Sequence, residues 1–221
     1  MHVQLRNGLH FCKCAERFIF LDVHTDRYFA LSGQVDLAFR AWIAGEVSTE
    51  EPSEHLNILI RTGLLVPAPG EAKIGEGSSL EPAKRDFYAR VVGRVGVTGA
   101  KAFLLRYRAR RNMRTQSFRA VLRDVSDRKA ALTSITNDAV GEISLACKAF
   151  GSTSWVFRAR DQCVPESIAF HRLCLDRGVP ATLFIGVKVN PFAAHCWVQH
   201  GDVVINDRME RIRQFTPILE I

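Results

Sequence analysis

The stretch from Arg160 to Asp207 reads RDQCVPESIAFHRLCLDRGVPATLFIGVKVNPFAAHCWVQHGDVVIND. Its first part carries the start and stop signals of one helix, which we expect to end at Gly178. From Thr182 onward, short runs of alternating apolar and polar residues are separated by turns, a pattern typical of strands. A helix followed by such strands predicts an α+β domain.

Cys163 stands at the expected start of this helix. Asp161 is a good N-cap residue, and Pro165 is tolerated only in a first helical turn. The unpaired N–H groups and the dipole at a helix N-terminus favour a thiolate, and they lower a cysteine pKa from about 8.5 toward ~3.5–7.5. The same N–H groups can stabilise an oxyanion. The pattern fits a nucleophile, and it fits equally a small thiol packed at the start of a helix.

His195 and Asp207 fall on two expected strands that are joined by a polar turn at 200–202. If all three residues form the turn, His195 and Asp207 lie opposite each other on one face, with Cβ atoms about 4.5–5.5 Å apart. An aspartate in that position fixes the histidine tautomer and stabilises the imidazolium. A two-residue turn would instead pair His195 with Arg208 and move Asp207 to the other face.

A cysteine, a histidine and an aspartate in this order support acyl transfer through a thioester. The competing side chains are less well placed. His171 lies eight residues along the helix from Cys163, about 12 Å away at 1.5 Å per residue. His200 and Asp202 belong to the expected turn or to the wrong face of the strand. The alternative is that the strand residues are sheet core and that the His–Asp pair is only a structural hydrogen bond.

Residues 1–66 have a separate pattern of strands followed by helices. Apolar runs at 17–23 and 27–31 flank a three-residue polar turn, which predicts a hairpin. Helices are expected after Ser32, which can act as a cap, and from Ser53. These elements are sufficient for one small domain.

A composition break at 67–80, rich in proline and glycine, predicts a linker before a second domain at 81–221. The pattern is helical from residue 81 to about residue 150. The net charge of +7 is local, since residues 81–130 carry 14 basic and 4 acidic side chains. This segment either docks an acidic partner or forms a solvated face whose long arginine stems cover apolar surface.

The composition is that of an ordinary globular protein, with 221 residues, 47% of them apolar and 24% charged. The longest stretch without a charged residue, Val189 to Gly201, has 13 residues, and a membrane span takes about 18 or more. The first six residues lack the features of a secretory signal, which favours a cytoplasmic location. The six cysteines are therefore expected to be thiols, and the Cys12-Lys13-Cys14 pair lacks a second pair at zinc spacing.

Three blocks of the second domain resemble the lasso-peptide maturation proteases, which belong to the transglutaminase-like cysteine protease superfamily. The blocks are Cys163 to Phe170, Leu173 with Arg177 to Val187, and Pro191 to Val198 with Asn206-Asp207. The resemblance implies a transglutaminase-like or papain-like fold, with helices followed by an antiparallel sheet. It also implies that Cys163 is the nucleophile, His195 the base and Asp207 the orienting residue. The chain departs from the family's commoner residues at three positions: Pro165, Cys196 and Gln199.

The first 66 residues resemble a precursor-peptide recognition element, a small winged-helix-like module that binds leader peptides. The hairpin from Phe20 to Ser32 and the helices after it carry this resemblance. It implies that the leader adds to the sheet as a further strand. By position, four residues are expected to line its groove: Tyr28, Phe29, Leu56 and Leu59. The alternative is that all four belong to the core, and for Leu59 the core role is the better interpretation.

Together the resemblances imply a fused enzyme that binds the leader of a ribosomal precursor peptide and cleaves it from the core. They imply no cofactor or metal, and they imply a separate, asparagine-synthetase-like cyclase as a partner. One alternative is an acyltransferase or transglutaminase with the same triad, because sequence does not separate water from an amine as the second nucleophile. Another alternative is a nucleic-acid-binding winged-helix protein with a basic middle segment. The net negative charge of the first unit argues against this alternative.

Overall fold

The computed structural model describes residues 3–46, 54–68, 83–87, 96–157 and 162–221. The chain divides into two compact units, Met1–Ser79 and Leu80–Ile221, and each is described by itself. Most of the expected linker at 67–80 lies outside the described residues. Within the described ranges, every helix is too short or too polar to cross a bilayer.

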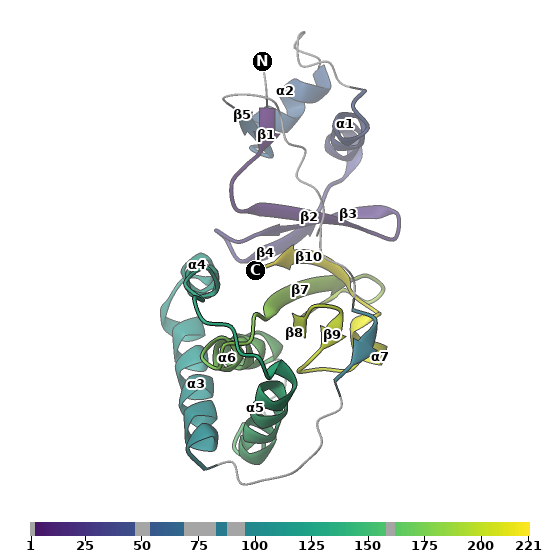
Figure 1. The fold of residues 1–221 in the computed structure, drawn as a ribbon. Coiled ribbons are helices and arrows are strands. Elements are labelled where there is room, and N and C mark those ends of the chain that lie inside the picture. Colours follow the sequence, from purple (N-terminus) through teal and green to yellow (C-terminus); the bar gives the residue numbers. More distant parts are fainter. Residues whose placement is uncertain (1–2, 47–53, 69–82, 88–95, 158–161) are drawn as a thin grey trace. The chain divides into compact units, whose positions relative to one another are not determined.

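The first unit contains two small antiparallel sheets and two helices (Figure 1). One sheet pairs β1 (Val3–Leu5) with β5 (Leu65–Pro67). The other has the order β2-β3-β4, with β2 (Leu9–Cys14), β3 (Arg17–Asp22) and β4 (Arg27–Ala30). The helices are α1 (Gly33–Ile43), whose N-cap is Ser32, and α2 (Glu54–Arg61). The hairpin and both helices confirm the local predictions, but the hairpin turn has four residues, Val23 to Asp26, and not the three that were predicted.

An aromatic cluster forms the core of the first unit. Phe39 of α1 is fully buried and meets the rings of Phe18 and Phe20 edge to face, with centroids 5.2 and 4.9 Å apart. Leu56 and Leu59 of α2 complete this core, with 3% and 0% of their surface exposed. This corrects the expectation that these two leucines line a binding groove. They recur on the apolar stripe of an amphipathic helix, and that stripe packs inward.

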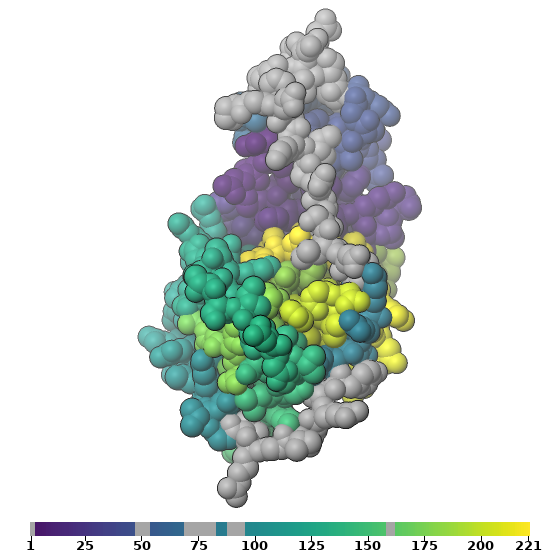
Figure 2. All heavy atoms as spheres, viewed as in Figure 1, coloured from purple at the N-terminus to yellow at the C-terminus, as the bar shows by residue number. Residues whose placement is uncertain are grey.

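The second unit packs helices against a five-stranded sheet of order β10-β7-β8-β9-β6. The helices are α3 (Gly96–Thr115), α4 (Phe118–Ala130), α5 (Ala139–Thr153) and α6 (Cys163–Leu175). The strands are β7 (Thr182–Lys188), β8 (Ala193–His200), β9 (Val203–Val204), β10 (Thr216–Glu220) and β6 (Arg85–Asp86), with α7 (Met209–Ile212) before β10. Figure 2 shows the teal and green helical residues of this unit directly beside its yellow C-terminal residues.

This α+β arrangement differs from the expected one at its edge. Arg85 and Asp86 form a strand that pairs in parallel with β9, so the sheet is mixed and not purely antiparallel. Residues 85–87 of the expected helical pattern are therefore not helical, residues 88–95 lie outside the described residues, and the first described helix of this unit begins at Gly96. A two-residue strand that pairs with a partner more than a hundred residues away leaves no local periodicity to detect.

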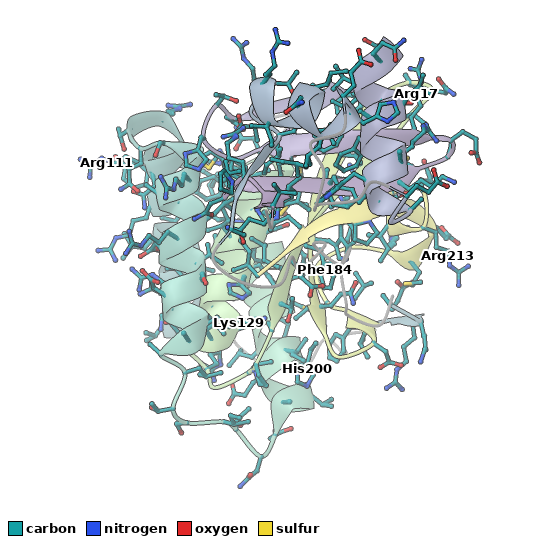
Figure 3. All side chains as sticks on the ribbon, turned by 90° about the horizontal axis from the view of Figure 1, so that it is seen from above. Arg17, Arg111, Lys129, Phe184, His200 and Arg213 are labelled. Atoms are coloured by element: carbon teal, nitrogen blue, oxygen red, sulfur yellow. The ribbon has the colours of Figure 1, made fainter. Side chains whose placement is uncertain are left out.

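The basic segment is not a uniformly solvated face. Arg106 of α3 is buried, with 7% of its surface exposed, and its guanidinium lies 4.4 Å from the ring centroid of Phe150. Arg110 lies one turn further along the helix, with its guanidinium 4.4 Å from the ring centroid of Phe157. Arg111, in contrast, extends outward from α3 (Figure 3). Part of the local charge therefore serves packing inside this unit.

Gly186 of β7 makes room for the indole of Trp197 on β8. The two strands pair antiparallel, with Phe184 opposite Trp197 and Gly186 opposite His195. The indole stacks on Phe184 at 5.5 Å between ring centroids. A Cβ on Gly186 would lie 2.7 Å from an indole carbon, closer than real Cβ atoms come to other heavy atoms. Glycine at this position thus allows the aromatic layer to pack beside His195.

Candidate active site

Cys163 is the first residue of α6, as the sequence predicts. The N-cap is Gln162, whose side chain makes no capping hydrogen bond, and the expected cap Asp161 lies outside the described residues. The thiol is partly buried. It contacts the His195 side chain and the backbone N–H groups of Val164 and Cys196. The start of the helix thus brings the sulfur to the strand that carries the histidine.

His195 and Asp207 are in direct contact, with 2.5 Å between Nε2 and Oδ2. The strand pairing differs from the predicted one. The turn after His200 has two residues, Gly201 and Asp202, and His200 pairs with Val203. The three-residue turn was therefore wrong. A regular ladder in the observed register would carry Asp207 to the far face of the sheet. The contact forms because β9 ends at Val204 and the chain then bends away from the ladder.

The three side chains shift one another's pKa values toward an ion pair. Burial alone would raise the pKa of the Cys163 thiol, but hydrogen bonding to His195, the imidazolium charge and two backbone N–H groups hold that pKa below its ordinary value. Burial would lower the pKa of His195, but its bonds to Asp207 and Cys163 raise it. Burial would likewise raise the pKa of Asp207, but His195 and the backbone N–H of Arg208 lower it. The arrangement favours a thiolate beside an imidazolium.

The triad lines one open cavity of about 740 Å³. Lys188, Phe215 and Arg211 also line this cavity, and the Phe215 ring lies 5.1 Å from that of His195. A second cavity, of about 990 Å³, shares Asp207 and Arg211 with the first. The two cavities therefore lie on either side of a shared wall that includes the aspartate.

A partly buried ion-pair network at the start of α6 was not predicted from the sequence. Glu166, in the first turn of α6, lies 2.7 Å from Nε of Arg106 and 3.2 Å from a terminal nitrogen of Arg110. The same Arg106 donates to the carbonyl of Phe150 at 2.9 Å. These arginines compensate a carboxylate that would otherwise oppose a thiolate one turn away. The sequence gives no signal that Arg106 and Arg110, which are four residues apart on α3, face inward.

The competing residues lie elsewhere. His171 is buried in α6, bonds to the carbonyl of Ala181 at 3.1 Å, and has its pKa lowered to about 4 by burial. His200 contacts the carbonyl of Pro180 at 3.0 Å. Asp202 is paired with Arg85 at 3.2 Å. None of these three lines the cavity that holds Cys163.

The four residues expected to bind a leader all belong to the first unit. Tyr28 and Phe29 lie on β4, an edge strand of the three-stranded sheet, and Phe29 is 36% exposed. The Phe29 ring stacks on Phe20 at 5.2 Å. Leu56 and Leu59 are core residues, as described above. The structure thus separates the expected set into an edge-strand pair and a buried pair.

We expect Cys163 to react with iodoacetamide at pH 6 before Cys12, Cys147, Cys174 and Cys196. Its pKa is lowered, whereas burial raises the pKa of Cys12 to about 12 and that of Cys147 to about 11. Burial also raises the pKa values of Cys174 and Cys196. Because only thiolates alkylate readily, peptide mapping by mass spectrometry after brief exposure should find the label on Cys163. Equal labelling of Cys147 and Cys163 at this pH would contradict the ion pair.

Comparison with protein families points to the part of the chain that carries Cys163, His195 and Asp207. Residues 103–220, more than half of the sequence, match the family model described as "Transglutaminase-like superfamily". The chain is also 37% identical over 62 residues to the "Microcin J25-processing protein McjB" of Escherichia coli. That match covers 28% of this chain and 30% of the relative, so the chain spans under a third of the relative's length in it. No solved structure matches the chain.

Proposed function

The chain belongs to the transglutaminase-like superfamily, and we propose that within it the protein is a cysteine peptidase that removes the leader from a lasso-peptide precursor. The observation that carries the proposal is the contact between Cys163, His195 and Asp207 in one open cavity. The resemblance to lasso-peptide maturation proteases and the partial match to a protein named for processing microcin J25 support a precursor peptide as the substrate.

The chemistry follows from the two nitrogens of His195. Nε2 is engaged by Asp207, so Nδ1 is the nitrogen that exchanges a proton with the Cys163 sulfur. The thiolate attacks the scissile carbonyl, the C–N bond breaks, and the imidazolium gives its proton to the leaving amine of the core. Water, deprotonated by the neutral imidazole, then hydrolyses the thioester, which leaves a carboxylate on the leader and restores the thiol.

We propose that the first unit captures the leader as the winged-helix-like recognition element that its sequence resembles. Within the described residues, β4 pairs with β3 on one side only, which leaves an edge for a further strand. Main-chain hydrogen bonds along this edge would supply affinity, and the side chains of Tyr28 and Phe29 would supply selectivity. Leucines 56 and 59 support the sheet from the core and take no direct part.

The direct test incubates the full chain with precursor peptides from neighbouring short reading frames and weighs the products. Hydrolysis predicts a leader fragment with a terminal carboxylate and a core with a new α-amine. A leader joined to an added amine, with no hydrolysed leader, would favour the acyltransferase alternative. The same resemblance leads us to propose that a separate ATP-dependent, asparagine-synthetase-like cyclase consumes the released core.

Truncating Phe29 to alanine is expected to weaken leader binding by about 5–30-fold, the cost typical of an aromatic anchor in an interface. The half-exposed ring offers an apolar face at the open edge of the sheet, and it is remote from the thiol in sequence. Fluorescence anisotropy with a labelled leader measures the affinity. Turnover at saturating precursor should stay near that of the unmodified chain, so the change falls on KM.

The matched control is Leu37→Ala, which removes an apolar side chain that is 56% exposed on α1. It should leave leader affinity within about twofold, as expected for a surface substitution outside an interface. If Leu37→Ala weakened binding as much as Phe29→Ala, the leader would not follow β4.

A further inference from the structure

The side chain of Asn206 replaces a main-chain rung of the sheet. The Ile205 N–H donates to the Val198 carbonyl at 3.0 Å, as an antiparallel ladder requires. The Val198 N–H, however, donates to Oδ1 of Asn206 at 2.7 Å. The Ile205 carbonyl accepts from the thiol of Cys147 at 3.3 Å. The chain therefore leaves the sheet at this point, and the Val198 N–H still has a partner.

This departure decides where Asp207 lies. In the observed register His200 pairs with Val203, so a ladder continued without interruption would put Cys196 opposite Asp207. Side chains of paired residues share a face, and Cys196 faces away from His195 because neighbouring strand residues alternate. The bend after β9 instead brings the Asp207 carboxylate to the imidazole at 2.5 Å.

A second anchor connects Asn206 to the helix that carries the nucleophile. Nδ2 of Asn206 donates to Oγ of Ser167 at 2.9 Å, and the Ser167 hydroxyl donates to the carbonyl of Cys196 at 2.8 Å. Ser167 is 2% exposed and lies four residues after Cys163, on the same face of α6. One continuous chain of hydrogen bonds thus joins the three segments that carry the triad.

We propose that Asn206 is a positioning residue of this peptidase site, which delivers Asp207 to His195 by replacing a ladder rung and by anchoring the bend to Ser167. The expected loss of kcat rests on the proposed function. The placement of Asp207 by Asn206 does not rest on it. Asn206 acts through Asp207, and it needs no contact with substrate.

Asn206→Ala tests the proposal with two readouts. A misplacement of about 1 Å costs on the order of 10²-fold in kcat, so we expect a loss of that size with KM little changed. The pH midpoint for alkylation of Cys163 by iodoacetamide should move upward, because a poorly oriented Asp207 stabilises the imidazolium less. The control Asn137→Ala, at an exposed asparagine of the same unit, should change neither readout.

A double-mutant comparison separates positioning from general damage. In an Asp207→Ala background, Asn206→Ala should lower kcat by less than about twofold more, since the residue through which it acts is already gone. Full additivity of the two losses would overturn the proposal. So would a folded Asn206→Ala protein with an unchanged alkylation midpoint.

Two provisions keep the outcome decisive. If Asn206→Ala does not fold, Ser167→Ala carries the test, because it removes the anchor and leaves the Val198 N–H paired. A smaller upward shift of the alkylation midpoint is then expected, and no shift would overturn the proposal. If no precursor is cleaved by the unmodified chain, the proposed function fails, while the alkylation midpoints of the variants still decide the role of Asn206.

Discussion

Cys163→Ala is expected to lower the rate of leader cleavage by on the order of 10⁴–10⁶-fold, because removing a nucleophile disables the whole catalytic set. The substitution deletes one sulfur at the start of α6, where the thiol is partly buried, so the fold should persist. Leader affinity should also persist, since we assign it to the first unit. Cleavage is followed by mass spectrometry, leader binding by anisotropy and the fold by circular dichroism.

Cys174→Ala is the matched control for this variant. It removes a thiol from the same helix, but one that is 1% exposed and whose pKa is raised by burial. Some stability is lost with a buried side chain, yet the rate per folded molecule should remain within a few-fold. A Cys163→Ala protein that still cleaves at a near-normal rate would exclude the thioester route.

Asp207→Asn is expected to lower kcat by about 10³–10⁴-fold, the scale seen when the orienting carboxylate of a triad becomes an amide. The amide can donate to Nε2 and thereby hold the wrong tautomer of His195. Without the carboxylate charge, the raised pKa of His195 falls and the lowered pKa of Cys163 rises. The ion pair exists between these two values, so the pH range of activity should narrow from both sides.

Asp202→Asn provides the comparison, because Asp202 is the nearest aspartate in sequence that the site does not use. Its carboxylate pairs with Arg85 at 3.2 Å, and exposed pairs contribute about 0.2–1 kcal/mol. The pH profile of this variant should match that of the unmodified chain. A profile that narrows in Asp202→Asn and not in Asp207→Asn would reassign the orienting residue.

The local elements of this protein were predictable from its sequence, because each has its own signals. Ser32 and Gly45 bracket a helix whose buried positions recur at helical spacing. Cys163 was expected at a helix start because a helix tolerates Pro165 only in its first turn. The residues of the triad were identified from such signals and from family resemblance. The structure then shows that their side chains are in contact.

The features that sequence did not reveal depend on long-range choices. Both two and three residues fit the turn after His200, and the compensation for the shorter turn comes from the Asn206 side chain, which no pattern describes. Leu56 could face a ligand or the core, since both environments favour leucine. Arg106 is buried because Glu166, 60 positions away, compensates its charge, and charge alone suggests exposure.

Gly186 has a consequence for any redesign of the proposed substrate cavity. Libraries that diversify the lining of the cavity would naturally include the strand opposite His195. Every replacement at Gly186 puts a side chain into the indole of Trp197 and toward Phe215, which contacts the imidazole. That codon is best held constant, and Lys188, a half-buried residue that lines the cavity, is the better place for diversity.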